Sequence, residues 1–173
     1  MRTGYSRQAG MVLLICLVFL LLLTLIGFSS MQAAISQERM AGGIWGRNQA
    51  FQSAEGGLRL GESVIKSPDF GLAPCHSIAT CAPPVEALSI TGPGTNPVSA
   101  IAWVSMKDGV YGIQNLGSSV GVAQLPADTP VTLYRVTSVA TGGPSRAVLE
   151  SVYARVATVG GERFQRVMWR QLQ

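Results

Sequence analysis

The chain has 173 residues, of which 47% are hydrophobic and 13% are charged, and its formal net charge is +4. This length predicts about one domain. Arg2 and Arg7 precede a long apolar segment, and without them 11 basic and 9 acidic residues leave a charge of only +2. This small charge, with basic side chains scattered along the chain, argues against a nucleic-acid-binding protein.

Residues 11–28, with the sequence MVLLICLVFLLLLTLIGF, form an apolar segment without charge in which Thr24 is the only polar side chain. A helix of this length rises about 27 Å, close to the hydrocarbon thickness of a membrane, and residues 29–31 can extend it. Cys16 is interpreted as a small apolar side chain that faces lipid or a neighbouring helix. We therefore predict a transmembrane helix over residues 11–31.

The residues ahead of this helix, MRTGYSRQAG, contain two arginines and no acidic residue. The positive-inside rule therefore predicts a cytoplasmic N-terminus and export of the rest of the chain across the membrane. A secretory signal would instead be cleaved after the apolar segment, where residues 29–34 offer only a weak site of small side chains. Cleavage at that site is the main alternative.

Beyond the span, apolar residues recur at helical intervals, which predicts an amphipathic continuation of the helix over residues 32–67, ending near Lys66. Charged side chains, among them Glu62, are assigned to the other faces of this helix. The glycine pairs at 42–43 and 56–57 are expected to weaken it locally, and Pro68 marks its end. The apolar stripe comprises Met40, Ile44, Phe51, Ala54, Leu58 and Ile65.

Residues 68–99 contain six prolines together with Cys75 and Cys81. We interpret this segment as an irregular, Pro-rich surface loop. If this part of the chain is exported, an oxidising compartment favours a disulfide between the two cysteines, which would close a short loop. Two unpaired thiols are the alternative.

The remaining residues, 100–173, show the alternation and the β-branched content typical of strands. Short turns separate the last three candidate strands and predict an antiparallel meander. A sheet of three or four strands packed on the amphipathic half of the helix gives an α+β fold with one hydrophobic core. The candidate strands are residues 100–106, 131–140, 147–158 and 163–172, and their aromatic residues interpreted as core are Trp103, Tyr153 and Trp169.

The sequence shows no pattern typical of a catalytic, metal or cofactor site. His76 is the only histidine, no GxSxG motif accompanies any serine, and the nine acidic residues show no dyad spacing. Cys75, His76 and Cys81 have poor spacing for zinc and lack a fourth ligand. We therefore predict a protein that associates with other proteins, without a cofactor or metal, and that is not an enzyme.

The start of the chain resembles a known class of export signal. A short basic leader, residues 1–10, that ends in Gly10 and is followed directly by an apolar helix is similar to the prepilin-type signal. More narrowly, RQAGMVLLICLVFLLLLTLIGFSSMQ, QERMAG and RNQAFQSAEGGLRLGE, within residues 7–65, resemble the N-terminal region of PilX-type minor pilins. The stretch LYRVTSVATGGPSRAVLESVYAR resembles the C-terminal sheet of such subunits.

This resemblance implies cleavage by a prepilin peptidase between Gly10 and Met11 and N-methylation of Met11. The mature chain would be a minor pilin in the assembly and priming of a type IV pilus; a type II secretion pseudopilin and a tip adhesin module are the alternatives. The implied partners are other minor and major pilins, the inner-membrane assembly platform and the peptidase. The chain would lie in the inner membrane with its head facing the periplasm, and after assembly in the fibre, whose cell adhesion and twitching motility belong to the whole machine.

One departure from the pilin pattern concerns the fifth mature position. Most pilins carry a glutamate there, whereas this chain has Ile15, and its first acidic residue after the leader is Glu38. In the family, that glutamate is thought to neutralise the N-terminal amine of the subunit already in place, since a buried unpaired charge is costly. A subunit with nothing above it needs no such partner, which suggests a position at or near the tip. Loss of the glutamate in a subunit inserted elsewhere is the alternative.

Overall fold

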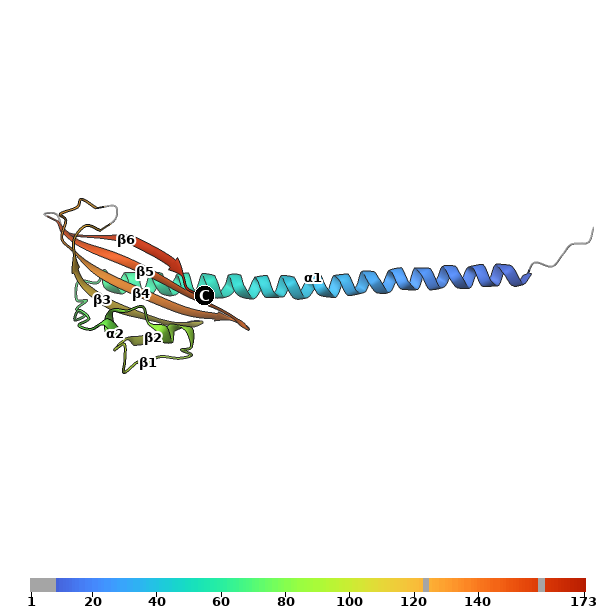
Figure 1. The fold of residues 1–173 in the computed structure, drawn as a ribbon, viewed down its shortest axis with the longest axis horizontal. Helices are drawn as coiled ribbons and strands as arrows, with labels where there is room; N and C mark the ends of the chain where they lie inside the picture. The colour runs from blue at the N-terminus through green and yellow to red at the C-terminus, as the bar shows by residue number, and fades with distance from the viewer. Residues whose placement is uncertain (1–8, 123–124, 159–160) are drawn as a thin grey trace, which may run out of the picture. The chain divides into compact units, whose positions relative to one another are not determined.

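The structure, a computed structural model, describes residues 9–122, 125–158 and 161–173. Its first element is one long helix, α1 (Ala9–Ile65), followed by the short helices α2 (Ile78–Cys81) and η1 (Val85–Leu88) (Figure 1). The strands are β1 (Gly94–Thr95), β2 (Ala102–Met106), β3 (Gly109–Ser119), β4 (Val131–Gly142), β5 (Ser145–Thr158) and β6 (Gly161–Gln171). The predicted α+β class, with a long N-terminal helix and an antiparallel sheet, is confirmed.

The chain divides into two compact units, one ending at Gly43 and the other beginning at Ile44. In the first unit, helix α1 carries exposed side chains at every position from 11 to 43. Among the described residues, α1 is the one helix that is long and apolar enough to cross a membrane. This finding agrees with the predicted transmembrane segment.

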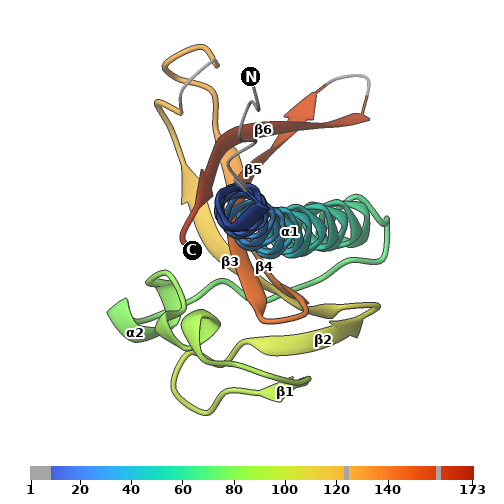
Figure 2. The same ribbon diagram turned by 90° about the vertical axis from the view of Figure 1, so that its right-hand side faces the viewer.

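The second unit is the head, in which residues 44–65 of α1 lie against the concave face of a curved sheet (Figure 2). Within the described residues the sheet has six antiparallel strands, which lie side by side in sequence order. The ladder between β4 and β5 runs from the pair Thr132 and Arg155 to the pair Gly142 and Ser145 at the tight turn. The meander predicted for the last three candidate strands is therefore confirmed.

The main core lies between α1 and the sheet, and small residues on α1 allow the close approach. A Cβ atom added to Gly46 would lie only 2.9 Å from the carbonyl oxygen of Gly142. The predicted stripe is confirmed from Phe51 onward, but Met40 and Ile44 are 66% and 60% exposed. The buried members are Ala50, Ala54, Leu58, Ile65, Tyr134, Val136, Ala140, Ala147 and Leu149.

Part of the opposite face of the sheet is covered by the segment between α1 and β2, which therefore does not behave as a simple surface loop. It contains α2, η1 and β1, and its residue Ala87 is fully buried. A second apolar cluster forms there between η1 and the strands. Its buried members are Ala87, Ile101, Trp103, Val110, Val139 and Val148.

The predicted sheet of three or four strands was too small, because the two-residue β1 and the longer β3 were both missed. Strand β3 is the larger omission. Its sequence, GVYGIQNLGSS, contains three glycines, which lower the apparent strand propensity. Packing requires two of them, since a Cβ atom on Gly109 would overlap the backbone of Val139, and one on Gly112 would overlap Ile101 and lie 3.3 Å from Trp103. Gly117 is needed for a different reason, because its φ of +85° belongs to the left-handed region.

Candidate functional site

The exposed apolar surface of α1 between residues 11 and 31 is the candidate functional site. Met11, Phe19 and Phe28 are each more than 60% exposed. The hydroxyl of Thr24 donates a hydrogen bond to the carbonyl oxygen of Leu21, so its polar group is satisfied within the helix. A helix with an apolar surface and internally satisfied polar groups suits lipid or a bundle of similar helices.

The residues predicted for processing lie at the start of this helix. Helix α1 begins at Ala9, which places Gly10 and Met11 in its first turn. Residues 1–8 of the predicted leader lie outside the described residues. Ile15 is 46% exposed and shares the apolar surface, while Glu38 lies exposed further along the helix. Cleavage after Gly10 and methylation of Met11 stay predictions.

In the head, Cys75 and Cys81 form a disulfide, with their Cα atoms 5.3 Å apart. The bridge closes a turn that contains α2, which starts with a capping box between Ser77 and Thr80. The backbone N–H of Cys75 donates to the carbonyl oxygen of Asn115 on β3, at 2.8 Å. This disulfide loop, residues 75–82, is thus fixed both internally and against the sheet.

Two polar side chains of the sheet attach the disulfide loop by its carbonyl oxygens. The amide nitrogen of Gln114 donates to Thr80 at 2.6 Å and to Ala82 at 3.1 Å. The guanidinium of Arg135 donates to Cys81 at 2.7 Å. Because carbonyl groups covered by a sheet need donors, these bonds hold the loop in one position over the outer face.

Arg135 in turn depends on Glu150, whose side chain is completely buried on the same face. The carboxylate of Glu150 lies 3.4 Å from Arg135 and 2.8 Å from Arg170. Burial lowers the pKa of the Arg135 guanidinium, and the nearby Glu150 carboxylate acts in the opposite direction. A buried acid between two arginines therefore supports the attachment of the disulfide loop.

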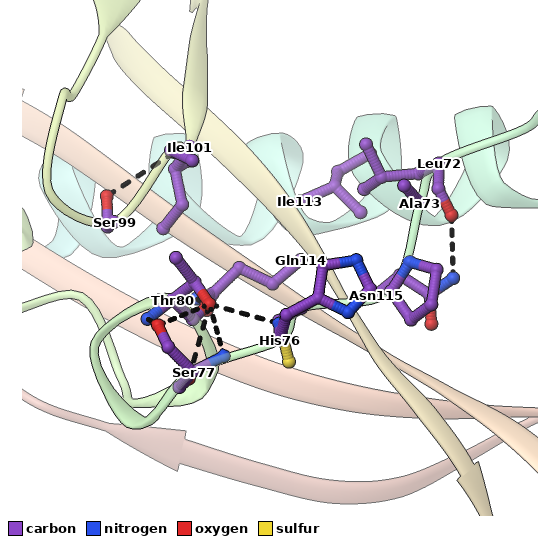
Figure 3. Close-up of a pocket in the computed structure, with 13 residues that line it drawn as sticks. Leu72, Ala73, His76, Ser77, Thr80, Ser99, Ile101, Ile113, Gln114 and Asn115 are labelled. Carbon is purple, nitrogen blue, oxygen red and sulfur yellow. Dashed lines mark hydrogen bonds between the residues drawn. The ribbon is translucent and has the colours of Figure 1, made fainter.

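A cavity of about 340 Å³ opens between the disulfide loop, residues 99–101 and β3 (Figure 3). Its walls are mainly apolar, and the side-chain amide of Asn115 is already bonded to Leu72. His76 lies at this cavity, but among the described residues no group of three or more His, Cys, Asp or Glu side chains is placed to hold a metal ion.

Sequence reasoning missed a polar contact between α1 and β6. Glu62, which was assigned to a face of the helix away from the apolar stripe, is only 8% exposed and forms an ion pair with Arg166. Arg166 also donates to the hydroxyl of Tyr153 at 2.7 Å, and burial raises the pKa of Tyr153 to about 12. The position of Glu62, four residues after Leu58 on the buried stripe, was the available signal.

Replacing both Cys75 and Cys81 with serine is expected to lower the free energy of unfolding of the head by about 2 kcal/mol. The disulfide closes a short loop and so limits the conformations of the unfolded chain; without the bridge, this entropic stabilisation of the folded head is lost. Denaturant unfolding of the purified full chain measures the change. Replacing the exposed Cys16 with serine is the control and should leave the midpoint unchanged. Equal stability of the double variant and the parent chain would contradict the expectation.

Comparison with known proteins assigns the helix to a family. Residues 9–59 match the family model described as PilX N-terminal. The match covers the exposed apolar segment and most of the half of α1 that packs on the sheet. No curated protein and no solved structure matches the chain. The N-terminal region is thus similar to that of PilX-type minor pilins, and its apolar helix fits a membrane-anchored pilin.

Proposed function

We propose that this chain, with its PilX-type N-terminal region, is a minor pilin that takes part in the assembly and priming of a type IV pilus. The match over residues 9–59, on a helix whose apolar side chains are exposed from Met11 onward, carries the proposal. Such side chains become buried only in lipid or against other helices. The partners are other minor and major pilins, the inner-membrane assembly platform and the prepilin peptidase.

Association of such helices depends on shape, because lipid tails are as apolar as the side chains they replace. Small residues therefore matter most, since they let two backbones approach. A Cβ atom added at Gly27, Gly42 or Gly43 would meet nothing within 4 Å. These positions are open to a neighbouring helix, as a subunit of a helical fibre core requires.

The tip position rests on Ile15. A subunit below another one would need an acid at this position to neutralise the amine above it, and isoleucine cannot do so. With Ile15 on an apolar surface and the first described acid at Glu38, the subunit is suited to a place with no pilin above it. Such a subunit enters the fibre first, which is the priming role.

The first test is the intact mass of the full chain extracted from membranes of cells with and without prepilin peptidase. We expect a chain that begins at Met11 and carries one methyl group, found only where the peptidase is active. A chain that begins near Ala33, or one of the same mass in both strains, would contradict processing as a pilin.

Replacing Ile15 with glutamate is expected to reduce the number of surface fibres about tenfold, equivalent to about 1.4 kcal/mol per initiation event. The new carboxylate would have no amine to neutralise at the tip and would be costly to bury. Fibres are counted by electron microscopy, with Ile15→Leu as the volume-matched control. Normal fibre numbers with the glutamate variant would remove the reason for placing the subunit at the tip.

A further inference from the structure

Strand β6 forms one edge of the sheet, and within the described residues it is paired only with β5. It is 11 residues long, whereas a typical strand has about five or six. In the described part of the chain, residues 166–171 make no backbone hydrogen bond to any element other than β5. Alternate N–H and C=O groups of an edge strand point away from its partner, so β6 presents a row of them.

The other edge of the sheet is protected, which makes β6 distinctive. Strand β1 has only two residues and is flanked by Pro93 and Pro97. Short edge strands and prolines both prevent pairing with another chain. Strand β6 contains no proline. The sheet therefore blocks one edge and leaves the longer one accessible.

Charged side chains can also protect an edge, but most of those on β6 are already paired within the chain. Arg166 is bound to Glu62, and Arg170 lies 2.8 Å from Glu150. Glu162 lies 3.4 Å from Arg155. In the described residues Arg163 is the exposed cation of β6 without an ion pair. The edge thus carries one uncompensated positive charge near its start.

The other end of β6 offers an apolar contact. Trp169 is 41% exposed although it packs edge-to-face on Phe51 of α1, with ring centroids 6.1 Å apart. A strand added beside β6 would place a side chain next to this indole ring and reduce its exposure. The same strand would pair the outward backbone groups, which gives affinity along its whole length.

We propose that β6 is the docking edge for an extended strand of a different protein chain, with an acidic side chain opposite Arg163 and an apolar side chain beside Trp169. A second copy of this chain fits less well, because the one glutamate of its β6, Glu162, already lies 3.4 Å from Arg155, so its strand would bring a second Arg163 and no free acidic side chain. Like charges across strands are destabilising. The inference concerns the head and goes beyond the proposed role in assembly.

The test uses the purified full chain in detergent micelles and two fluorescent ten-residue peptides, one alternating valine with glutamate and the other valine with lysine. Fluorescence anisotropy should show that the glutamate peptide binds about threefold tighter or more. Arg163→Glu should reverse this order, and Arg163→Lys should keep it. Hydrogen exchange should slow at β6 amides when the glutamate peptide binds.

Three results would overturn the proposal. These are no binding of either peptide, binding that leaves β6 exchange unchanged, and a peptide preference that Arg163→Glu does not alter. Sedimentation of the chain alone completes the test, because a dimer with slowed exchange in β6 would make a second copy the occupant. Since none of these measurements involves fibres, their failure would leave the processing and fibre-count tests unaffected.

Discussion

Replacing Glu150 with alanine is expected to lower the free energy of unfolding of the head by about 3 kcal/mol. Its side chain is completely buried, and the side chain of its neighbour Arg135 is only 12% exposed. Removing one member of a buried ion pair leaves the other charge without compensation, which costs about 3–5 kcal/mol. Because the side chain of Arg170 is partly exposed to solvent, we expect a loss of unfolding free energy at the lower end of this range. Denaturant unfolding followed by tryptophan fluorescence measures this loss, because Trp103 is buried in the apolar cluster between η1 and the sheet and becomes exposed when the head unfolds.

The matched control is Glu162→Ala, which removes a carboxylate whose side chain is 49% exposed and lies 3.4 Å from Arg155. An exposed ion pair contributes less than about 1 kcal/mol, so this variant should unfold near the parent midpoint. Glu150→Ala should also speed hydrogen exchange in residues 75–82, because Arg135 would lose the carboxylate that supports its bond to the disulfide loop. Equal destabilisation by both variants would show that burial of Glu150 has no special role.

Replacing Gly57 with leucine is expected to cost about 3 kcal/mol, at the upper end of the range for overpacking a core. A Cβ atom at this position would overlap the side chains of Ser138 and Met106, and Ser138 is fully buried. The helix would have to move away from the sheet to admit the new side chain. The unfolding midpoint of the full chain, measured as for Glu150, reports the change.

The neighbouring residue provides the control for this prediction. A Cβ atom on Gly56 meets nothing within 4 Å, so Gly56→Leu should stabilise the head by about 0.5–1 kcal/mol through helix propensity. Opposite signs at two adjacent positions would show that contact with the sheet, and not the helix itself, decides the result. Stabilisation by both substitutions would contradict the packing described for Gly57.

Much of the fold follows from patterns that depend on neighbours in the sequence. The run over residues 11–28 and the stripe from Phe51 to Ile65 predicted α1, and helical periodicity carries both signals. Alternation and short turns likewise predicted β4, β5 and β6, because each pairs with the strand next to it in the chain. Local chemistry decides these elements, so they can be predicted.

Features decided by distant residues could not be predicted in this way. The buried position of Glu62 depends on Arg166, which lies 104 residues further along the chain. Trp169 was interpreted as core, and this was wrong because its side chain, on the edge strand β6, is 41% exposed although it contacts Phe51 of α1. Strand β3 was hidden by glycines that fit packing partners and a special backbone angle.

The residues of the candidate sites likewise fall into two groups, those that a local sequence signal predicts and those that only contacts between distant segments reveal. Gly10, Met11 and Ile15 were identified from the order of leader, glycine and apolar helix, which is a local signal, and the family match covers them. Cys75 and Cys81 were singled out by their spacing. The attachment of the disulfide loop through Gln114 and Arg135 joins segments more than 30 residues apart, and only the folded head reveals it.

Because the strands lie in sequence order, each one finds its partner in the strand made just before it. Contacts of low sequence separation form quickly, so the sheet can grow hairpin by hairpin as the chain emerges. The second half of α1 is made before any strand, yet its buried stripe packs on β4 and β5. Its apolar face must therefore stay uncovered until residue 149 has appeared. During that interval the newly made helix is open to capture by chaperones, and a delay in synthesis between residues 65 and 149 should prolong it.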